Sequence, residues 1–188
     1  MNLKLVCKVV GHVLLLEACA LLLPLLVALI YRESPLPYLL SIAVIAAVGL
    51  LLTRVKTTSR FYTREGFCTV GLIWLATGVV GALPFWFSGG FPSFVDCIFE
   101  SVSGFTTTGA TILTDIEAQP YGILFWRAFT HWLGGMGVLV LATALLPSMG
   151  IRSHYLTQAE TPGPVFSKLV PKQSQTSKIL YAMYCALT

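Results

Sequence analysis

The sequence predicts an all-α integral membrane protein: two N-terminal transmembrane helices, one repeat of helix, short re-entrant helix and helix, and the start of a second repeat. Two observations predict this class. Of the 188 residues, 56% are hydrophobic and 11% are charged, whereas about a quarter of the residues in a soluble domain are charged. The hydrophobic residues also form four long runs, at residues 5–30, 36–52, 67–87 and 121–146. Each run is about as long as the roughly 20 residues that a helix needs to cross a bilayer.

The first two runs form an N-terminal helix pair within residues 1–58. The start of the chain has the composition of a secretion signal, because Lys4 and Lys8 precede an apolar stretch. That stretch continues to residue 30, however, well beyond the roughly 7 to 15 residues of a signal core. We therefore interpret it as a retained transmembrane helix. Within it, Glu17 and His12 are an intramembrane acid and base, for which we favour a helix contact or an interfacial position over a functional role.

Lysine and arginine residues lie in alternate loops, and this placement predicts the orientation. They precede the first run, fill the loop after the second and follow the fourth: Lys4, Lys8, Arg54, Lys56, Arg60, Arg64, Arg152, Lys168, Lys172 and Lys178. The positive-inside rule therefore places the N-terminus in the cytoplasm. Residues 88–120 contain neither residue type and carry four acidic side chains, at Asp96, Glu100, Asp115 and Glu117. This outward-facing stretch would raise the local cation concentration, while the net charge of +4 gives no indication of a nucleic-acid partner.

A short helix is predicted between the third and fourth runs. Gly89 and Gly90 end the preceding helix, Pro92 suits the first turn of the next one, and Gly104 is expected to end it. The twelve residues 92–103 show apolar side chains three and four positions apart and would extend about 18 Å, roughly half a membrane. Because residues 121–146 must still cross inward, both ends of this segment open outward, and we expect a re-entrant hairpin.

The loop after this short helix reads Thr106, Thr107, Thr108, Gly109 and Ala110. Threonine hydroxyls and successive carbonyls are oxygen ligands for a hard cation, and the C-terminal end of the short helix carries partial negative charge toward them. Gly109 permits the positive φ that aligned carbonyls can require. We therefore predict dehydration and passage of a monovalent cation. The alternative is that glycine and threonine mark an ordinary external loop.

Two motifs in the sequence are similar to those of a known protein family. The arrangement of "FESVSGFTTTGAT" followed by "FWRAFTHWLGGMGVLVLATALLP" resembles the first membrane–pore–membrane repeat of the Trk/Ktr/HKT superfamily of potassium transporters, and is most similar to the bacterial Trk-type potassium-translocating subunit. The resemblance implies potassium uptake through a pore of four repeats, each donating one filter strand. In this chain the central filter glycine is Gly109, with Thr107, Thr108 and Ala110 beside it, Thr106 at the inner approach, and K⁺ held at Thr107 and Thr108.

The resemblance also implies the surroundings of the protein. These are the bacterial cytoplasmic (inner) membrane, a multi-pass topology, a homodimer when the protein is full length, and a cytosolic nucleotide-binding regulatory subunit. K⁺ is the transported ion, and no covalent cofactor is implied. Family members carry four repeats, whereas this chain has one, at residues 59–148, followed by a linker at 149–177 and the start of a second repeat at 178–188. We therefore expect a truncated chain that does not conduct alone.

Two other functions stay open at the level of the sequence. One is a membrane enzyme or scaffold with a non-conducting outer loop, although no nucleophile with a companion base is apparent, and we expect no enzyme. The other is a single-repeat homotetrameric cation channel.

Further residues in the fourth run call for an interpretation. Gly134, Gly135 and Gly137 are unusual within a helix and predict close packing against the hairpin, with a gating hinge as the alternative. Arg127 and His131 share a helix face, and we favour a structural pairing, with Glu100 or with the pore.

Overall fold

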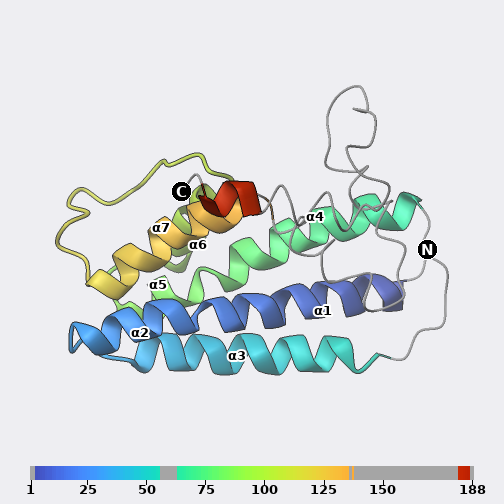
Figure 1. Ribbon diagram of the computed structural model, residues 1–188, viewed down its shortest axis with the longest axis horizontal. Helices are drawn as coiled ribbons and strands as arrows, with labels where there is room; N and C mark the ends of the chain where they lie inside the picture. The colour runs from blue at the N-terminus through green and yellow to red at the C-terminus, as the bar shows by residue number, and fades with distance from the viewer. Residues whose placement is uncertain (1–2, 56–62, 136, 138–181, 187–188) are drawn as a thin grey trace.

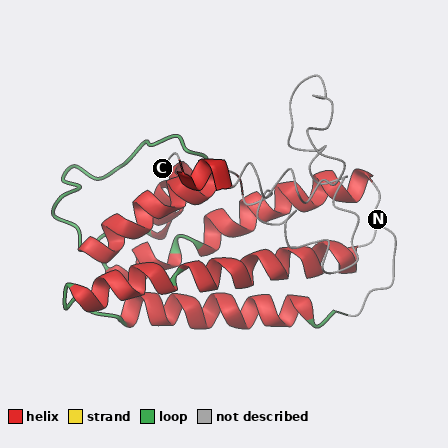
Figure 2. Cartoon of the chain, viewed as in Figure 1, coloured by secondary structure: helices red, strands yellow, loops and turns green. Residues whose placement is uncertain are grey.

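The computed structural model describes residues 3–55, 63–135, 137 and 182–186. All regular structure within these ranges is helical, as Figure 2 shows. Three helices are long and apolar enough to cross a membrane, at Leu3–Ile30, Leu36–Thr53 and Cys68–Ser88. The prediction of an all-helical chain with membrane-spanning helices is therefore confirmed. The linker at 149–177, most of the expected second repeat and the end of the fourth run lie outside the described residues.

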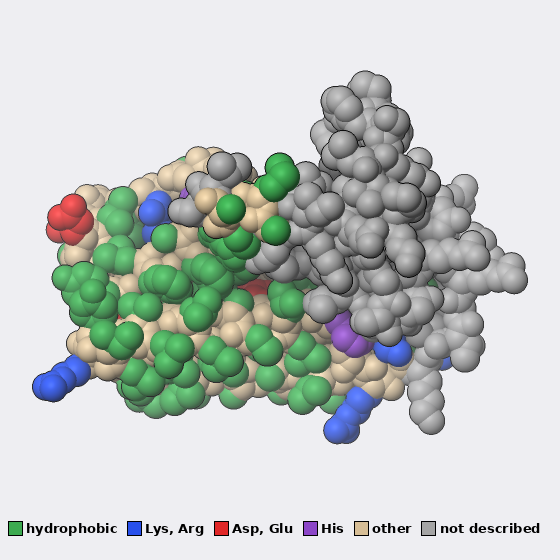
Figure 3. All heavy atoms as spheres, in the orientation of Figure 1, with side chains coloured by type: hydrophobic (Ala, Val, Ile, Leu, Met, Phe, Trp, Pro, Cys, Tyr) green, Lys and Arg blue, Asp and Glu red, His purple; other side chains and the backbone are tan. Residues whose placement is uncertain are grey.

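The N-terminal helices form an antiparallel pair that runs along one side of the molecule (Figure 1). One member of the pair is formed by α1 (Leu3–Ala20) and α2 (Leu22–Ile30) in succession. The other member is α3 (Leu36–Thr53), which packs against both. Side chains at helical spacing on α1, such as Val6 and Val13, are buried together with Tyr38 and Ile45 of α3. Hydrophobic side chains also cover the outer face of this pair (Figure 3), as a surface in contact with lipid requires.

Prolines interrupt two of the predicted runs. A proline has no N–H and its ring clashes with the carbonyl four residues earlier. Accordingly, α1 ends at Ala20, four residues before Pro24, and α4 (Thr63–Val80) ends four residues before Pro84. Each helix resumes at once, as α2 and as α5 (Leu83–Ser88). The single helices predicted at residues 5–30 and 67–87 are therefore each two helices, although each pair still covers one candidate span.

Two further helices follow α5, the first packing against α4 and the second against α2. They are α6 (Phe94–Phe105) and α7 (Tyr121–Gly135), which pack side by side and are joined by residues 106–120 (Figure 1). Trp126 of α7 is fully buried and its indole Nε1 donates to the Gly81 carbonyl oxygen at 3.0 Å. Because Gly81 lies between α4 and α5, this bond ties α7 to the proline-induced break.

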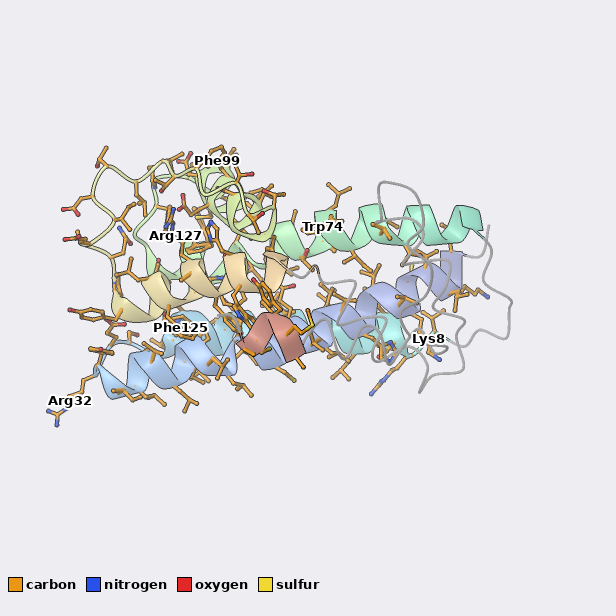
Figure 4. All side chains as sticks on the ribbon, turned by 45° about the horizontal axis from the view of Figure 1, so that its top comes forward. Lys8, Arg32, Trp74, Phe99, Phe125 and Arg127 are labelled. Carbon is orange, nitrogen blue, oxygen red and sulfur yellow. The ribbon has the colours of Figure 1, made fainter. Side chains whose placement is uncertain are left out.

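Lys8 and Arg54 lie at one end of the bundle, whereas Arg32, Glu33 and Glu117 lie at the other. Figure 4 shows Lys8 near one end of the helix pair and Arg32 at the other. Arg54 follows the last residue of α3 and therefore lies at the end where α1 begins. Glu117 and residues 118–120 line a cavity with Glu33 and Ser34 of the α2–α3 turn and therefore lie at the opposite end. Glu33 and Glu117 thus lie away from Lys8 and Arg54, although Arg32 shares their end of the structure.

The boundaries predicted for the short helix are wrong at both ends. Ser93 is the N-cap of α6, so Pro92 lies before the helix instead of in its first turn. Gly104 lies inside α6, which ends only at Phe105. Its role is close packing, because a Cβ at Gly104 would overlap the Thr130 hydroxyl of α7.

Candidate functional site

The site begins at the C-terminal end of α6. At the other end of this helix, the Ser93 hydroxyl accepts a hydrogen bond from the Asp96 N–H at 3.2 Å and donates to the Asp96 carboxylate at 2.8 Å. Serine is a favoured N-cap, and the carboxylate complements the positive end of the helix dipole. The opposite, partially negative end therefore points at Thr106, where the helix stops.

Two residues in the left-handed region reverse the chain after α6. Thr107 has φ 57° and Gly109 has φ 75°. Glycine adopts this conformation without strain, whereas for a β-branched residue such as Thr107 it is a genuine outlier. Strained backbone of this kind gathers at functional sites, where the surrounding structure enforces it.

The reversal directs the N–H groups of the loop back onto α6. Thr107 N donates to the Gly104 carbonyl at 2.9 Å, while Thr108 N and Gly109 N donate to the Ser103 carbonyl at 3.0 and 3.4 Å. The peptide donors of the loop are thus used locally. This leaves the opposite side of each peptide, its carbonyl oxygen, to face away from the helix end.

The carbonyl oxygens of Thr106, Thr107, Thr108 and Gly109 accept no hydrogen bond from the described part of the chain. All four residues and Ala110 are exposed. The Ala110 carbonyl differs, because it accepts a hydrogen bond from the Ser103 hydroxyl at 2.6 Å. Within the described residues, the loop therefore has four consecutive carbonyl oxygens without a hydrogen-bond donor, and carbonyl oxygens from several such loops together replace the hydration shell of a monovalent cation in carbonyl-lined filters.

Two of the three threonine hydroxyls in the loop are already engaged in hydrogen bonds. Thr106 Oγ1 donates to the Val102 carbonyl at 2.7 Å and also lies 2.8 Å from Thr108 Oγ1. These two hydroxyls are thus paired with each other, and Thr106 is tied to the helix. The backbone of the loop, more than its hydroxyls, is left free to meet a ligand.

A buried carboxylate fixes the segment that follows the loop. Glu100 of α6 is 1% exposed. One of its oxygens accepts from the Thr111 hydroxyl at 3.0 Å and from Ile112 N at 3.4 Å, and the other pairs with Arg127 Nε of α7. Figure 4 shows Arg127 between α7 and the segment. One carboxylate therefore links α6, α7 and the returning chain.

Helix α7 also contacts the loop through His131 and the end of α6 through Gly134. A Cβ at Gly109 would lie 3.8 Å from His131 Nε2, so the imidazole lies beside the loop. A side chain at Gly134 would overlap the Phe105 carbonyl oxygen. This is the close approach that the packing interpretation of the glycines requires. Gly135 faces the Tyr184 hydroxyl in the same way, and Gly137 has φ 69°.

The expected pairing of Arg127 with Glu100 is present, whereas Ser103 and Thr111 were not singled out from the sequence. Both hydroxyls lie within the quoted motif, Thr111 directly after the five loop residues and Ser103 three positions before them. In the first helix, His12 Nδ1 lies 2.7 Å from the Lys8 carbonyl oxygen. Glu17 is 3% exposed, and its carboxylate oxygens meet no hydrogen-bond partner among the described residues.

Known proteins resemble this chain over its whole length. Residues 38–188 match the family described as TrkH, cation transport protein. The chain is 40% identical over 194 residues to the Trk system potassium uptake protein TrkH of Escherichia coli K12, covering 100% of this chain and 40% of that protein. It is 35% identical over 191 residues to the E. coli K12 Trk system potassium uptake protein TrkG, covering 99% and 39%.

A solved structure gives the same result. The crystal structure of the potassium transporter TrkH from Vibrio parahaemolyticus superposes with a TM-score of 0.78 at 34% sequence identity, covering 100% of this chain and 38% of that one. The chain thus spans about 40% of the length of the curated relatives it matches.

Proposed function

The chain belongs to the TrkH family of cation transport proteins, and from this premise we propose that it is part of a protein that takes up K⁺ across the bacterial cytoplasmic membrane. The names of its relatives support potassium uptake, and they favour transport over the enzyme alternative. The proposed contribution of this chain is one of four filter strands, because a single segment supplies only one wall of a site that must surround an ion.

This proposal depends on the four consecutive carbonyl oxygens from Thr106 to Gly109, which accept no hydrogen bond from the described residues. We place the filter at Thr107, Thr108, Gly109 and Ala110, with Thr106 at the inner approach and K⁺ at Thr107 and Thr108. The partially negative end of α6 favours a cation at this position, and the positive φ of Gly109 supports the role of central filter residue.

We further propose that α6 and residues 106–120 form a re-entrant hairpin opening to the outside, with the N-terminus in the cytoplasm. The contacts of Phe105 with Gly134 and of Gly90 with Gln119 support this arrangement. They indicate that α6 and α7 run in the same direction, so that residues 106–120 must return along them. Such irregular backbone is tolerated at membrane depth only where protein buries it or where it lines a watery cavity.

The partners are proposed from family membership. We expect the full-length protein to form a homodimer in the lipid membrane and to meet a cytosolic nucleotide-binding regulatory subunit, with residues 149–177 as the candidate contact. Gly134, Gly135 and Gly137 are proposed as packing positions, with the contact between Gly134 and the Phe105 carbonyl as support.

The test is Gly109→Ser in the full-length protein, with K⁺ and Na⁺ uptake measured in cells that lack other potassium uptake. We expect reduced K⁺/Na⁺ discrimination while the protein still inserts. Gly89→Ser is the matched control, because Gly89 also has positive φ, 72°, but ends α5 with open space around it. Unchanged ion flux and unchanged K⁺/Na⁺ selectivity in Gly109→Ser would contradict the assignment of Gly109 to the filter.

A further inference from the structure

The turn between α2 and α3 contacts the first residues of α7, almost ninety positions later in the chain. The two oxygens of the Glu33 carboxylate accept hydrogen bonds from Tyr121 N at 2.6 Å and from Gly122 N at 3.0 Å. The rings of Tyr31 and Tyr121 stack with centroids 4.3 Å apart. The N-terminal helix pair is therefore fastened to the start of α7 by polar and aromatic contacts.

Helix α7 has no cap of its own at this end. The first N–H groups of a helix lack partners within the helix, and a side-chain acceptor before the helix normally supplies them. Pro120, which immediately precedes α7, has no such acceptor. Glu33 takes this role from another part of the chain, and its negative charge also suits the positive end of the helix dipole.

The backbone of the α2–α3 turn is shaped to present Glu33. Arg32 has φ 59°, a conformation that is costly for a residue with a side chain. Arg32 N donates to the Leu29 carbonyl at 3.2 Å and Glu33 N to the Ala28 carbonyl at 2.8 Å, which is the Schellman arrangement that normally contains glycine. The Arg32 side chain extends away from the bundle (Figure 4), so its own contacts do not explain the strained backbone.

The position of α7 matters for the loop, because Arg127 lies less than two turns beyond the capped end. Arg127 holds Glu100, and Glu100 holds Thr111 and Ile112 at the end of the loop. We propose that Glu33 is a positioning residue for the ion-binding segment, acting through α7 and the Arg127–Glu100 pair. This inference rests on the proposed function, and it gives the N-terminal helix pair a role in setting the geometry of the filter.

The test compares Glu33→Ala with the wild type in the full-length protein. Loss of a helix cap and of preorganisation predicts an increase of about three- to tenfold in the K⁺ concentration for half-maximal uptake, with the maximal rate per copy within about twofold. Glu33→Gln, which keeps an acceptor oxygen, should recover part of the affinity. An unchanged half-maximal concentration in Glu33→Ala would overturn the inference.

Glu117→Gln separates positioning from simple attraction of cations. Glu33 and Glu117 line the same cavity of about 510 Å³, but the Glu117 side chain makes no hydrogen bond to α7 within the described residues. Glu117→Gln should therefore have normal K⁺ affinity. If both variants weakened affinity equally, loss of negative charge would explain the result and the positioning role would be refuted.

Amide hydrogen exchange provides a readout that does not depend on transport. Glu33→Ala should accelerate exchange at Tyr121 and Gly122 and also at Thr108, Gly109 and Ile112. Faster exchange at the start of α7 alone would show a purely local cap and overturn the inference. A wild-type protein that took up no K⁺ would instead refute the proposed function, and the exchange comparison would still decide whether Glu33 positions the segment.

Discussion

Replacement of Glu100 by glutamine tests the network that holds the candidate loop. Glutamine has nearly the same shape and keeps one acceptor oxygen, but it carries no charge and presents two N–H donors in place of the second oxygen. In the structure both carboxylate oxygens face donors, Arg127 Nε on one side and the Thr111 hydroxyl and Ile112 N on the other. Either orientation of the amide therefore places a donor against a donor.

The expected cost follows from burial. Breaking a buried ion pair by removing one partner costs about 3–5 kcal/mol, because the other charge is left uncompensated. The Glu100 side chain is 1% exposed but that of Arg127 is 18% exposed, so solvent compensates part of the remaining charge. We therefore expect Glu100→Gln to reduce the free energy of unfolding by about 2–4 kcal/mol, about 1 kcal/mol less than the range for fully buried pairs.

The assay is a double-mutant cycle on purified full-length protein, with Glu100→Gln, Arg127→Met and the double variant compared by unfolding free energy and K⁺ uptake. The two changes should be strongly non-additive, as expected for residues in direct contact. Glu117→Gln, an exposed carboxylate in the same outer segment, should change stability by less than about 0.5 kcal/mol. Additive effects, or a loss below 0.5 kcal/mol in Glu100→Gln, would refute the reasoning.

Two further substitutions test the loop and its packing. Gly134→Ala should destabilise the protein by about 1–3 kcal/mol in thermal unfolding, because the new methyl would overlap the Phe105 carbonyl oxygen; Gly71→Ala, with no described atom within 4 Å of the methyl, should be neutral or stabilising. Thr107→Gly should raise stability by up to about 1 kcal/mol by relieving the positive φ. Thr106→Gly should lower it, since the Thr106 backbone is right-handed and its hydroxyl bonds would be lost. A loss of stability in Thr107→Gly equal to that in Thr106→Gly would argue against strain at Thr107.

Much of the helical content could be predicted because long apolar runs have few alternatives in a membrane. The runs at 36–52 and 67–87 correspond closely to α3 and to the span ending at Ser88. Hydropathy alone does not predict the breaks before Pro24 and Pro84, although the steric rule for proline does. Hydropathy gives only the length of an apolar run. It contains no information on the carbonyl four residues before a proline, which loses its N–H donor within the helix.

The candidate site was located by sequence, but its supporting contacts depended on tertiary structure. The Gly-Thr composition indicated a loop with exposed oxygens, and the structure describes unpaired carbonyls there. Gly104 was interpreted as a helix stop because glycine commonly ends helices, whereas its contact with Thr130 of α7 involves a residue 26 positions later. The bond from Glu33 to Tyr121 N likewise joins distant segments that no local pattern connects.

Anomalous diffraction from crystals of the full-length protein with Tl⁺, a heavy substitute for K⁺, tests the central claim most directly. The prediction is an anomalous peak coordinated by the carbonyl oxygens of Thr107, Thr108 and Gly109 together with those of three further strands around a common axis. It would be contradicted by Tl⁺ sites that lie only elsewhere in the protein, with these carbonyls hydrogen-bonded to neighbouring protein groups.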